Sequence, residues 1–187
     1  MLLAASCRRD PPPRAGGSPV AAPVHAGVAV LAAPQDTSPF AGTTGVLHKA
    51  RPGAPPAILA AVRVMTDPGY DRVVFEFAGD SLPGYHVEYV RSPVRRCGSG
   101  DPVALGGRER LVVRLEPAQA HDERGQPTVE RRELAPGLPA ITEMKLICDF
   151  EGQVEWALGV AATHPYRMLE ATGPRPPRLT LDVRHRP

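Results

Sequence analysis

The side chains that could do chemistry here are three cysteines, six histidines and the acidic residues, and their spacing argues against catalysis. The sequence contains no G-x-S-x-G, H-E-x-x-H or phosphate-binding glycine loop. The histidines are scattered without metal-ligand spacing, and His86 is expected to face solvent beside Glu88. Asp149 and Glu151 flank an expected turn and are interpreted as turn and solubility residues. The sequence therefore predicts no catalytic residue, no metal site and no cofactor.

Cys7 stands apart from the other two cysteines. It follows small residues in "AASC" and precedes arginines and prolines, where no core could cover a thiol. The pattern resembles a lipobox, in which the cysteine is acylated and becomes the mature N-terminus. We expect Cys7 to carry a lipid; the alternative is an incidental cysteine in a tail. Only six residues precede Cys7, which is enough for the tail of a signal peptide but not for a whole one. Residues 1–7 are therefore interpreted as the remnant of a signal peptide, whose start codon lies upstream or whose sequence was trimmed.

Cys97 and Cys148 remain once Cys7 is assigned to the lipid. Cys97 lies in the turn-rich "RRCGSGDP", and Cys148 lies in an expected strand. In an oxidising compartment a leftover pair is expected to form a disulfide. The alternative is two unpaired thiols, with Cys148 filling space in the core.

Composition limits the class of protein. The chain of 187 residues has 42% hydrophobic residues, enough for one domain with a core, and a net charge of +2. The small charge argues against a nucleic-acid partner, which would normally face a concentrated basic surface. No apolar stretch reaches the 18 residues that indicate a membrane-spanning helix.

Two regions are distinguished by their hydrophobic pattern. Residues 8–57 are rich in proline, glycine and alanine, and their apolar residues follow neither a helical nor a strand period. Such a segment cannot bury enough surface to offset the cost of ordering its backbone, so we interpret it as a disordered linker. Residues 58–187 are interpreted as the folded domain.

The folded domain shows about eight segments in which apolar and polar residues alternate, cut by glycine, proline and aspartate. "RVVFEF" places Val73, Phe75 and Phe77 on one face, and "EMKLICDF" places Met144, Leu146, Cys148 and Phe150 together. Trp156 belongs to an apolar face and is predicted to lie in the core. The other segments are "ILAAVRV", "YHVEYV", "RLVVRLE", "QVEWALGV", "YRMLEA" and "RLTLDV". Because no long helical pattern separates them, we predict an all-β fold, an antiparallel β-sandwich.

Residues 117–139 interrupt this rhythm with a polar stretch that is long for a connection. We interpret it as a solvated excursion, with a short helix near "TVERREL" as an alternative. A functional loop is the other reading.

The strands "YDRVVFEFAGD", "LPGYHVEYV" and "CDFEGQVEWALGVA" and the closing "PPRLTLDVRH" resemble the AMIN-like domain of bacterial envelope proteins, often lipoproteins. The resemblance covers about residues 58–186. It implies a β-sandwich, and the related AMIN domains are non-catalytic modules that target larger proteins to peptidoglycan. We expect no attached enzyme or secretin domain, which departs from that arrangement.

From these residues and this resemblance we expect a non-catalytic, lipid-anchored binding module outside the cell membrane, recognising cell-wall polymer or an envelope protein. Arg72, Tyr89 and Arg178 are the candidate ligand-binding residues, because they stand at strand positions suited to polar recognition. One alternative is a structural partner in an envelope complex, in which a strand edge pairs with another protein. The less favoured alternative is a hydrolase, with His121, Asp122 and Glu123 in its site.

Overall fold

The computed structural model describes residues 40–173 and 176–186. Cys7, the signal-peptide remnant and residues 8–39 of the predicted linker lie outside the described residues. The described part contains strands and no helix. Its strands are β1 (Leu47–Lys49), β2 (Ala57–Asp67), β3 (Tyr70–Phe77), β4 (Gly84–Tyr89), β5 (Glu109–Glu116), β6 (Ala118–Gln119), β7 (Glu133–Leu134), β8 (Ile141–Phe150), β9 (Gln153–Val160), β10 (Tyr166–Ala171) and β11 (Arg178–Arg184).

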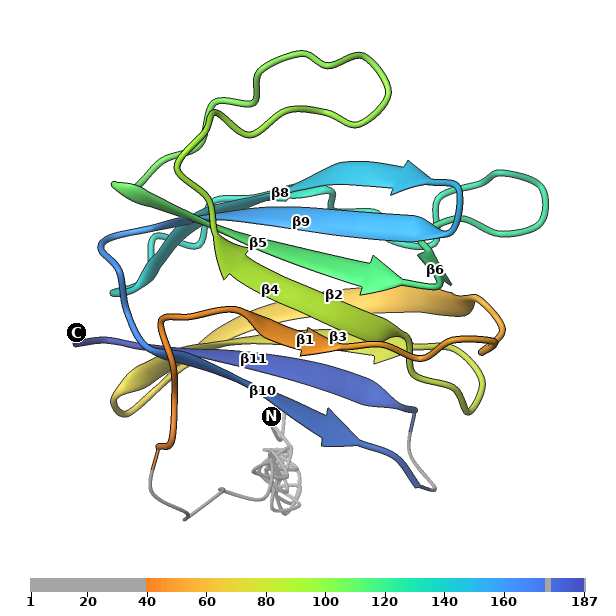
Figure 1. Cartoon of the computed structure of the whole chain (residues 1–187), viewed down its shortest axis with the longest axis horizontal. Coiled ribbons are helices and arrows are strands. Elements are labelled where there is room, and N and C mark those ends of the chain that lie inside the picture. Colours follow the sequence, from red (N-terminus) through yellow and green to blue (C-terminus); the bar gives the residue numbers. More distant parts are fainter. Residues whose placement is uncertain (1–39, 174–175, 187) are drawn as a thin grey trace, which may run out of the picture. The chain divides into compact units, whose positions relative to one another are not determined.

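The strands form two sheets that pack face to face (Figure 1). One sheet has six strands in the order β1-β4-β5-β9-β8-β7, and the other has five in the order β10-β11-β3-β2-β6. Neighbouring strands are antiparallel, except for the two-residue parallel pairing of β2 with β6. The predicted β-sandwich is confirmed, and β1, β6 and β7 are short strands that the hydrophobic pattern did not indicate.

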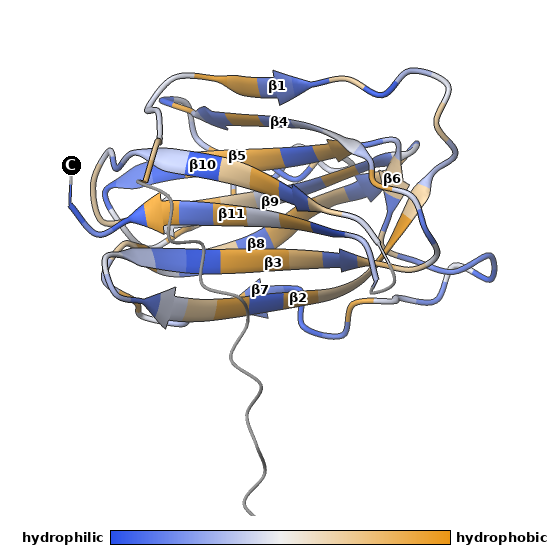
Figure 2. Cartoon of the chain, turned by 90° about the horizontal axis from the view of Figure 1, so that it is seen from below, coloured by the Kyte–Doolittle hydropathy of each residue, from blue (hydrophilic) through white to orange (hydrophobic). Residues whose placement is uncertain are grey.

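The core lies between the sheets because each long strand has one apolar face. Val73, Phe75 and Phe77 of β3 are each 0% exposed, as their alternation predicted. Trp156 is also 0% exposed, and its ring centroid lies 6.5 Å from that of Phe75. Burying one large apolar side chain is worth about 1.5–3 kcal/mol, so this layer supplies the main stabilisation. In Figure 2 hydrophobic and hydrophilic residues alternate along the strands of the five-stranded sheet.

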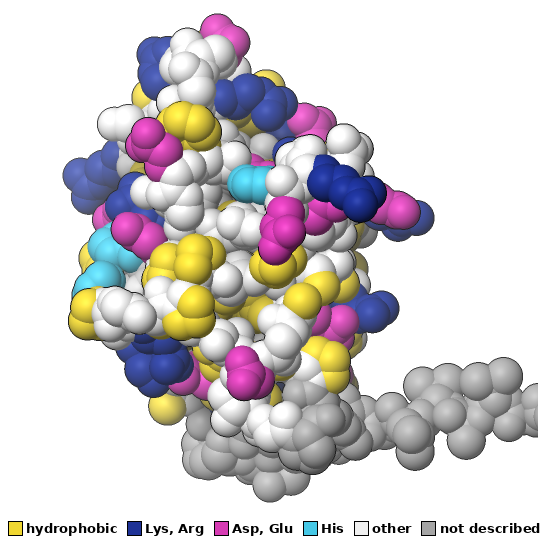
Figure 3. Space-filling model, turned by 90° about the vertical axis from the view of Figure 1, so that its right-hand side faces the viewer, with side chains coloured by type: hydrophobic (Ala, Val, Ile, Leu, Met, Phe, Trp, Pro, Cys, Tyr) yellow, Lys and Arg dark blue, Asp and Glu magenta, His cyan; other side chains and the backbone are white. Residues whose placement is uncertain are grey.

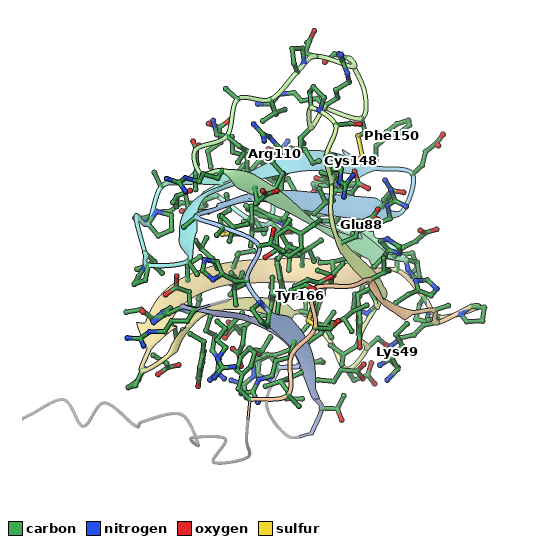
Figure 4. All side chains as sticks on the ribbon, turned by 60° about the vertical axis from the view of Figure 1, so that its left-hand side comes forward. Lys49, Glu88, Arg110, Cys148, Phe150 and Tyr166 are labelled. Carbon is green, nitrogen blue, oxygen red and sulfur yellow. A yellow bond between two sulfur atoms is a disulfide. The ribbon has the colours of Figure 1, made fainter. Side chains whose placement is uncertain are left out.

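Strand β8 departs from the predicted alternation. Met144 and Leu146 are buried in the main core, but a β-bulge between Leu146 and Cys148 shifts the register against β9. Cys148 therefore lies opposite Glu155, on the outer face, and Phe150 is 61% exposed. Figure 4 shows Phe150 on the outside of the sandwich. The prediction that Cys148 and Phe150 share the core face was wrong, because one extra residue in a strand reverses every later side chain.

A hairpin-like excursion, residues 94–103, covers part of the outer face of the six-stranded sheet and stands at the top of Figure 1. Val94 packs there with Ile147 and Ala157 in a second apolar cluster. A disulfide joins Cys97 to Cys148, with their Cα atoms 5.2 Å apart, which confirms the predicted pairing. The backbone N–H of Cys97 also donates to the carbonyl of Ile147 at 3.1 Å.

The sandwich begins before residue 58, the predicted boundary. Within the segment assigned to the linker, β1 adds an edge strand to β4, and Thr43 forms a backbone bridge with Tyr166. Residues 40–57 therefore include part of the folded unit. Their pattern hid this because β1 is only three residues long, too short for a period of two to be visible.

Residues 117–139 are partly buried, and no helix forms there. Ala118, Ala120 and Val129 belong to the main core. The Asp149 carboxylate accepts a hydrogen bond from the Ala120 N–H at 2.8 Å and lies 2.9 Å from His121 Nδ1. Arg132 also bonds to Asp149 at 3.1 Å. Asp149 therefore holds this segment in place and is not the solvated turn residue that the sequence indicated. Residues 117–139 are likewise not a simple solvated excursion.

Two polar side chains join the sheets. Asp71 of β3 is 0% exposed, and its carboxylate accepts hydrogen bonds from the N–H groups of Ala140 at 2.7 Å and Ile141 at 2.9 Å. At the edge strand β10, the Tyr166 hydroxyl lies 2.8 Å from the Val87 carbonyl of β4. Figure 4 shows Tyr166 between the two sheets.

Among the described residues, no helix is both long and apolar enough to pass through a membrane.

Candidate functional site

A cleft lies at the margin of the six-stranded sheet, where the chain turns after β1. Its volume is about 440 Å³. One wall is made by the ends of β4 and β5, and the other by β1 and the turn that follows it. Its lining residues are His48, Lys49, Ala50, Arg51, Pro52, Gly53, Ala54, Gly84, Tyr85, His86, Arg114, Glu116 and Pro117. Figure 3 views the end of the sandwich at the right of Figure 1, with neighbouring histidine side chains at its left and basic side chains above and below them.

Strand register sets one wall of the cleft. His48, His86 and Arg114 are directly paired across β1, β4 and β5, so their side chains lie in one row on the outer face. The ring centroids of His48 and His86 are 5.6 Å apart in an edge-on arrangement. Arg114 is 44% exposed and forms an ion pair with Glu155, the next residue of the row, whose side chain is only 11% exposed.

The opposite wall is held by a carboxylate of the other sheet. Glu170 of β10 accepts hydrogen bonds from Lys49 Nζ at 2.7 Å and from an Arg51 guanidinium nitrogen at 2.6 Å. Arg51 Nε also donates to the Pro83 carbonyl at 3.2 Å. Two cations thus share one carboxylate, and the turn is positioned against both sheets.

A tyrosine of the cleft remains a hydrogen-bond donor at neutral pH. Burial raises the pKa of Tyr85 above its ordinary value of 10.0, and the nearby Glu170 carboxylate adds to this shift. Glycine is required at the base of the cleft: a Cβ on Gly84 would stand 2.5 Å from the Lys49 carbonyl oxygen. A bulkier residue there would separate β1 from β4.

The cleft offers N–H donors, carboxylate acceptors, imidazoles and a phenol, and its charges largely offset one another. Such a surface can bind a neutral or zwitterionic polar ligand through hydrogen bonds, and it gives little long-range attraction for an anion. Within the described residues, no group of three or more His, Cys, Asp or Glu side chains could hold a metal ion.

The predicted ligand-binding residues lie elsewhere and do not form one surface. Arg72 is bonded through Nε to Asp182 at 2.7 Å and its side chain is 12% exposed. The Tyr89 hydroxyl donates to the His164 carbonyl at 2.8 Å and accepts from the His164 N–H at 2.9 Å. Arg178 lies opposite Glu76 on the outer face of the five-stranded sheet. Of these three residues, Arg72 and Tyr89 are used in hydrogen bonds within the fold, and Arg178 is the one for which the described residues show no such bond.

The cleft residues His48, Lys49 and Arg51 were missed because they stand in the segment interpreted as linker. The segment "VLHK" places two apolar residues before two polar ones and shows no alternation that would indicate a strand. His86 faces outward beside Glu88, as its strand position predicted, and its Nε2 lies 3.2 Å from a Glu88 carboxylate oxygen.

The residues of the hydrolase reading serve the loop itself. His121 is bonded to Asp149, and the Asp122 carboxylate accepts the backbone N–H groups of Arg124 at 2.9 Å and Gln126 at 2.8 Å. These contacts describe a stabilised turn.

Comparison with protein families identifies the folded part of the chain as an AMIN-like domain. The family model matches residues 57–185, so the chain belongs to the AMIN-like domain family. The comparison with curated proteins gives no match. Membership of this family indicates an extracytoplasmic module of the cell envelope.

Proposed function

We propose that this chain is a non-catalytic binding module, anchored outside the cell membrane by a lipid on Cys7, which binds peptidoglycan through the cleft between β1, β4 and the end of β5. The observation that carries the proposal is a cleft of about 440 Å³ with both donors and acceptors, in an AMIN-like domain. Wall polymer presents hydroxyls, amides and carboxylates, which need both kinds of group. The volume falls in the range of about 300–1,000 Å³ that is typical of ligand sites.

Binding is tested by co-sedimentation of the full chain with purified peptidoglycan. Replacing both imidazoles of the cleft, His48→Ala with His86→Ala, should weaken binding about tenfold, which corresponds to roughly 1.4 kcal/mol. Arg178→Ala is the control, because this residue lies on the other sheet. If Arg178→Ala weakens binding and the histidine variant does not, the site is on the five-stranded sheet. If the chain neither sediments with peptidoglycan nor captures an envelope protein, the binding function is wrong.

The absence of catalysis is tested with the same material. Incubation with wall fragments and with model esters should give no turnover above buffer. Turnover that is lost on His121→Ala would favour a hydrolase.

The lipid on Cys7 is tested in cells, with a complete signal peptide supplied ahead of residue 1. A diacylated cysteine supplies the two chains that stable anchoring requires, so the protein should fractionate with membranes. Cys7→Ser should release it or leave it unprocessed. An intact mass that shows an unmodified Cys7 with its leader attached would contradict the anchor.

A further inference from the structure

Strand β2 presents an open edge to its surroundings. On one side, residues 61–67 pair with β3. On the other side, β6 covers only Ala57 and Ile58. Across the part of the chain that the structure describes, no backbone hydrogen bond reaches residues 61–67 from this second side. In Figure 2, β2 forms the lower margin of the front sheet.

The other sheet margins are closed or short. β1 and β7 have three and two residues, which leaves little backbone to pair with another chain. β10 has a bridge to Thr43, and Glu170 at its end is bonded to Lys49 and Arg51. Short or covered margins are how proteins avoid unwanted strand pairing. Residues 61–67 are the exception.

The outward side chains of this edge are not committed to strong partners. Met65 is 39% exposed. Arg63 is 62% exposed and meets Glu76 at 3.2 Å, and Asp67 is 31% exposed and lies 3.8 Å from Arg72. The first pair has an exposed guanidinium and the second contact is long, so neither holds its outward side chain strongly.

We propose that this edge pairs with the same edge of a second copy of the chain, antiparallel and with Met65 opposite Met65. A two-fold axis perpendicular to the sheet keeps each side chain on its own face, so residues of like parity lie opposite each other. With the axis at Met65, Arg63 of each copy lies opposite Asp67 of the other. An axis at Arg63 would place the two copies of Arg63 opposite each other. An axis at Val64 or Thr66 would leave Arg63 and Asp67 without an opposite charge directly across the pairing. The register at Met65 alone satisfies both charges and covers both methionines.

Sedimentation velocity of the full chain, from low to high micromolar concentration, tests the pairing. The chain should pass from monomer to dimer, as a weak, small interface does. Arg63→Asp places two carboxylates opposite each other at each end of the pairing, and Asp67→Arg places two guanidiniums there, so each variant alone should stay monomeric. An equimolar mixture of the two should dimerise again, because the introduced aspartate of one variant then faces the introduced arginine of the other. Arg108→Asp, an exposed charge change away from β2, should leave the dimer unchanged.

Cross-linking tests the register independently of the charges. In a Cys7→Ser background, Met65→Cys should form an intermolecular disulfide under mild oxidation, because self-opposed residues are within disulfide reach. Asp67→Cys should not, since its two copies would lie about 13 Å apart. A chain that stays monomeric at every concentration, a mixture that fails to dimerise, or equal cross-linking at both positions would overturn the proposal.

Discussion

The outer faces of the two sheets are covered by opposite means. On the six-stranded sheet, the excursion of residues 94–103 covers Ile147 and Ala157 with apolar side chains and is fastened by the disulfide. On the five-stranded sheet, Asp182 is 0% exposed although it points away from the core, because Arg72 and Arg167 lie on either side of it in one cross-strand row. The Asp182 carboxylate bonds to Arg72 Nε at 2.7 Å and to Arg167 Nε at 2.9 Å.

Aromatic rings complete the polar cover. The Arg167 guanidinium lies 4.7 Å from the ring centroid of Phe40, and that of Arg72 lies 5.0 Å from the ring of Tyr70. The difference between the faces shows two ways to exclude water from a sheet: a covalently fastened apolar excursion, and a shared carboxylate beneath cations and rings. The stability contributed by the fastened excursion should depend on redox state, and that contributed by the polar cover should depend on a single carboxylate, that of Asp182.

The largest effect is expected from Asp182→Ala. It removes the carboxylate shared by two guanidiniums whose side chains are only 12% and 9% exposed. Loss of one partner from such a buried cluster typically costs about 3–5 kcal/mol. Urea unfolding followed by Trp156 fluorescence measures the change. Glu76→Ala, which removes an exposed pair on the same face, should cost less than about 1 kcal/mol. Equal effects of the two substitutions would show that burial of the cluster does not matter.

The disulfide comes next. Cys97→Ser with Cys148→Ser should lower the free energy of unfolding by about 2–4 kcal/mol, because the bond closes a long loop in the unfolded chain. Its sequence separation is 51 residues. Reduction of the wild-type protein should cost a similar amount, and the Asp182→Ala effect should be unchanged by reductant. An unfolding midpoint that is identical with and without reductant would contradict a stabilising role for the bond.

A smaller effect is expected where the two sheets meet. Tyr166→Phe removes one buried hydroxyl and should cost about 1 kcal/mol. Burial raises the pKa of Tyr166 from 10.0 to about 12. The unfolded chain therefore loses this proton first, and the stability that the residue contributes below pH 10 is lost as the pH rises to about 12. Wild-type stability should fall more steeply over this range than that of the phenylalanine variant. Parallel alkaline curves for the two proteins would contradict the assignment.

The smallest effect is expected on stability at acidic pH, through His164. His164 is 4% exposed, and burial lowers its pKa below the ordinary value of 6.5. The unfolded chain then binds a proton more readily, so the stability contributed by the neutral ring is present above pH 6.5 and is lost as the pH falls. His164→Leu should show a shallower loss in acid-unfolding curves than the wild type. A steeper acid loss in the variant would mean that the imidazole is charged in the folded state.

Alternation was sufficient to predict the sandwich and much of its core. Phe75, Phe77 and Trp156 could be assigned to the interior because a period of two leaves one face of each strand apolar. The Cys97–Cys148 pair was also predictable, since elimination of Cys7 leaves two cysteines. The bulge in β8 was not, because an inserted residue depends on how β9 and β8 pair.

Almost none of the candidate site could be predicted from the sequence. His48 and His86 are 38 positions apart in the chain, and only the pairing of β1 with β4 brings their rings together. Arg72 looked like a surface arginine because Asp182, its partner, is 110 residues away. Outside the bulge of β8, the sequence by itself determined which residues the long strands turn inward, because that choice depends on local hydrophobicity and backbone geometry. Tertiary structure alone decided which outward side chains meet, because cross-strand rows depend on strand order and register, and these are settled only when distant segments pair.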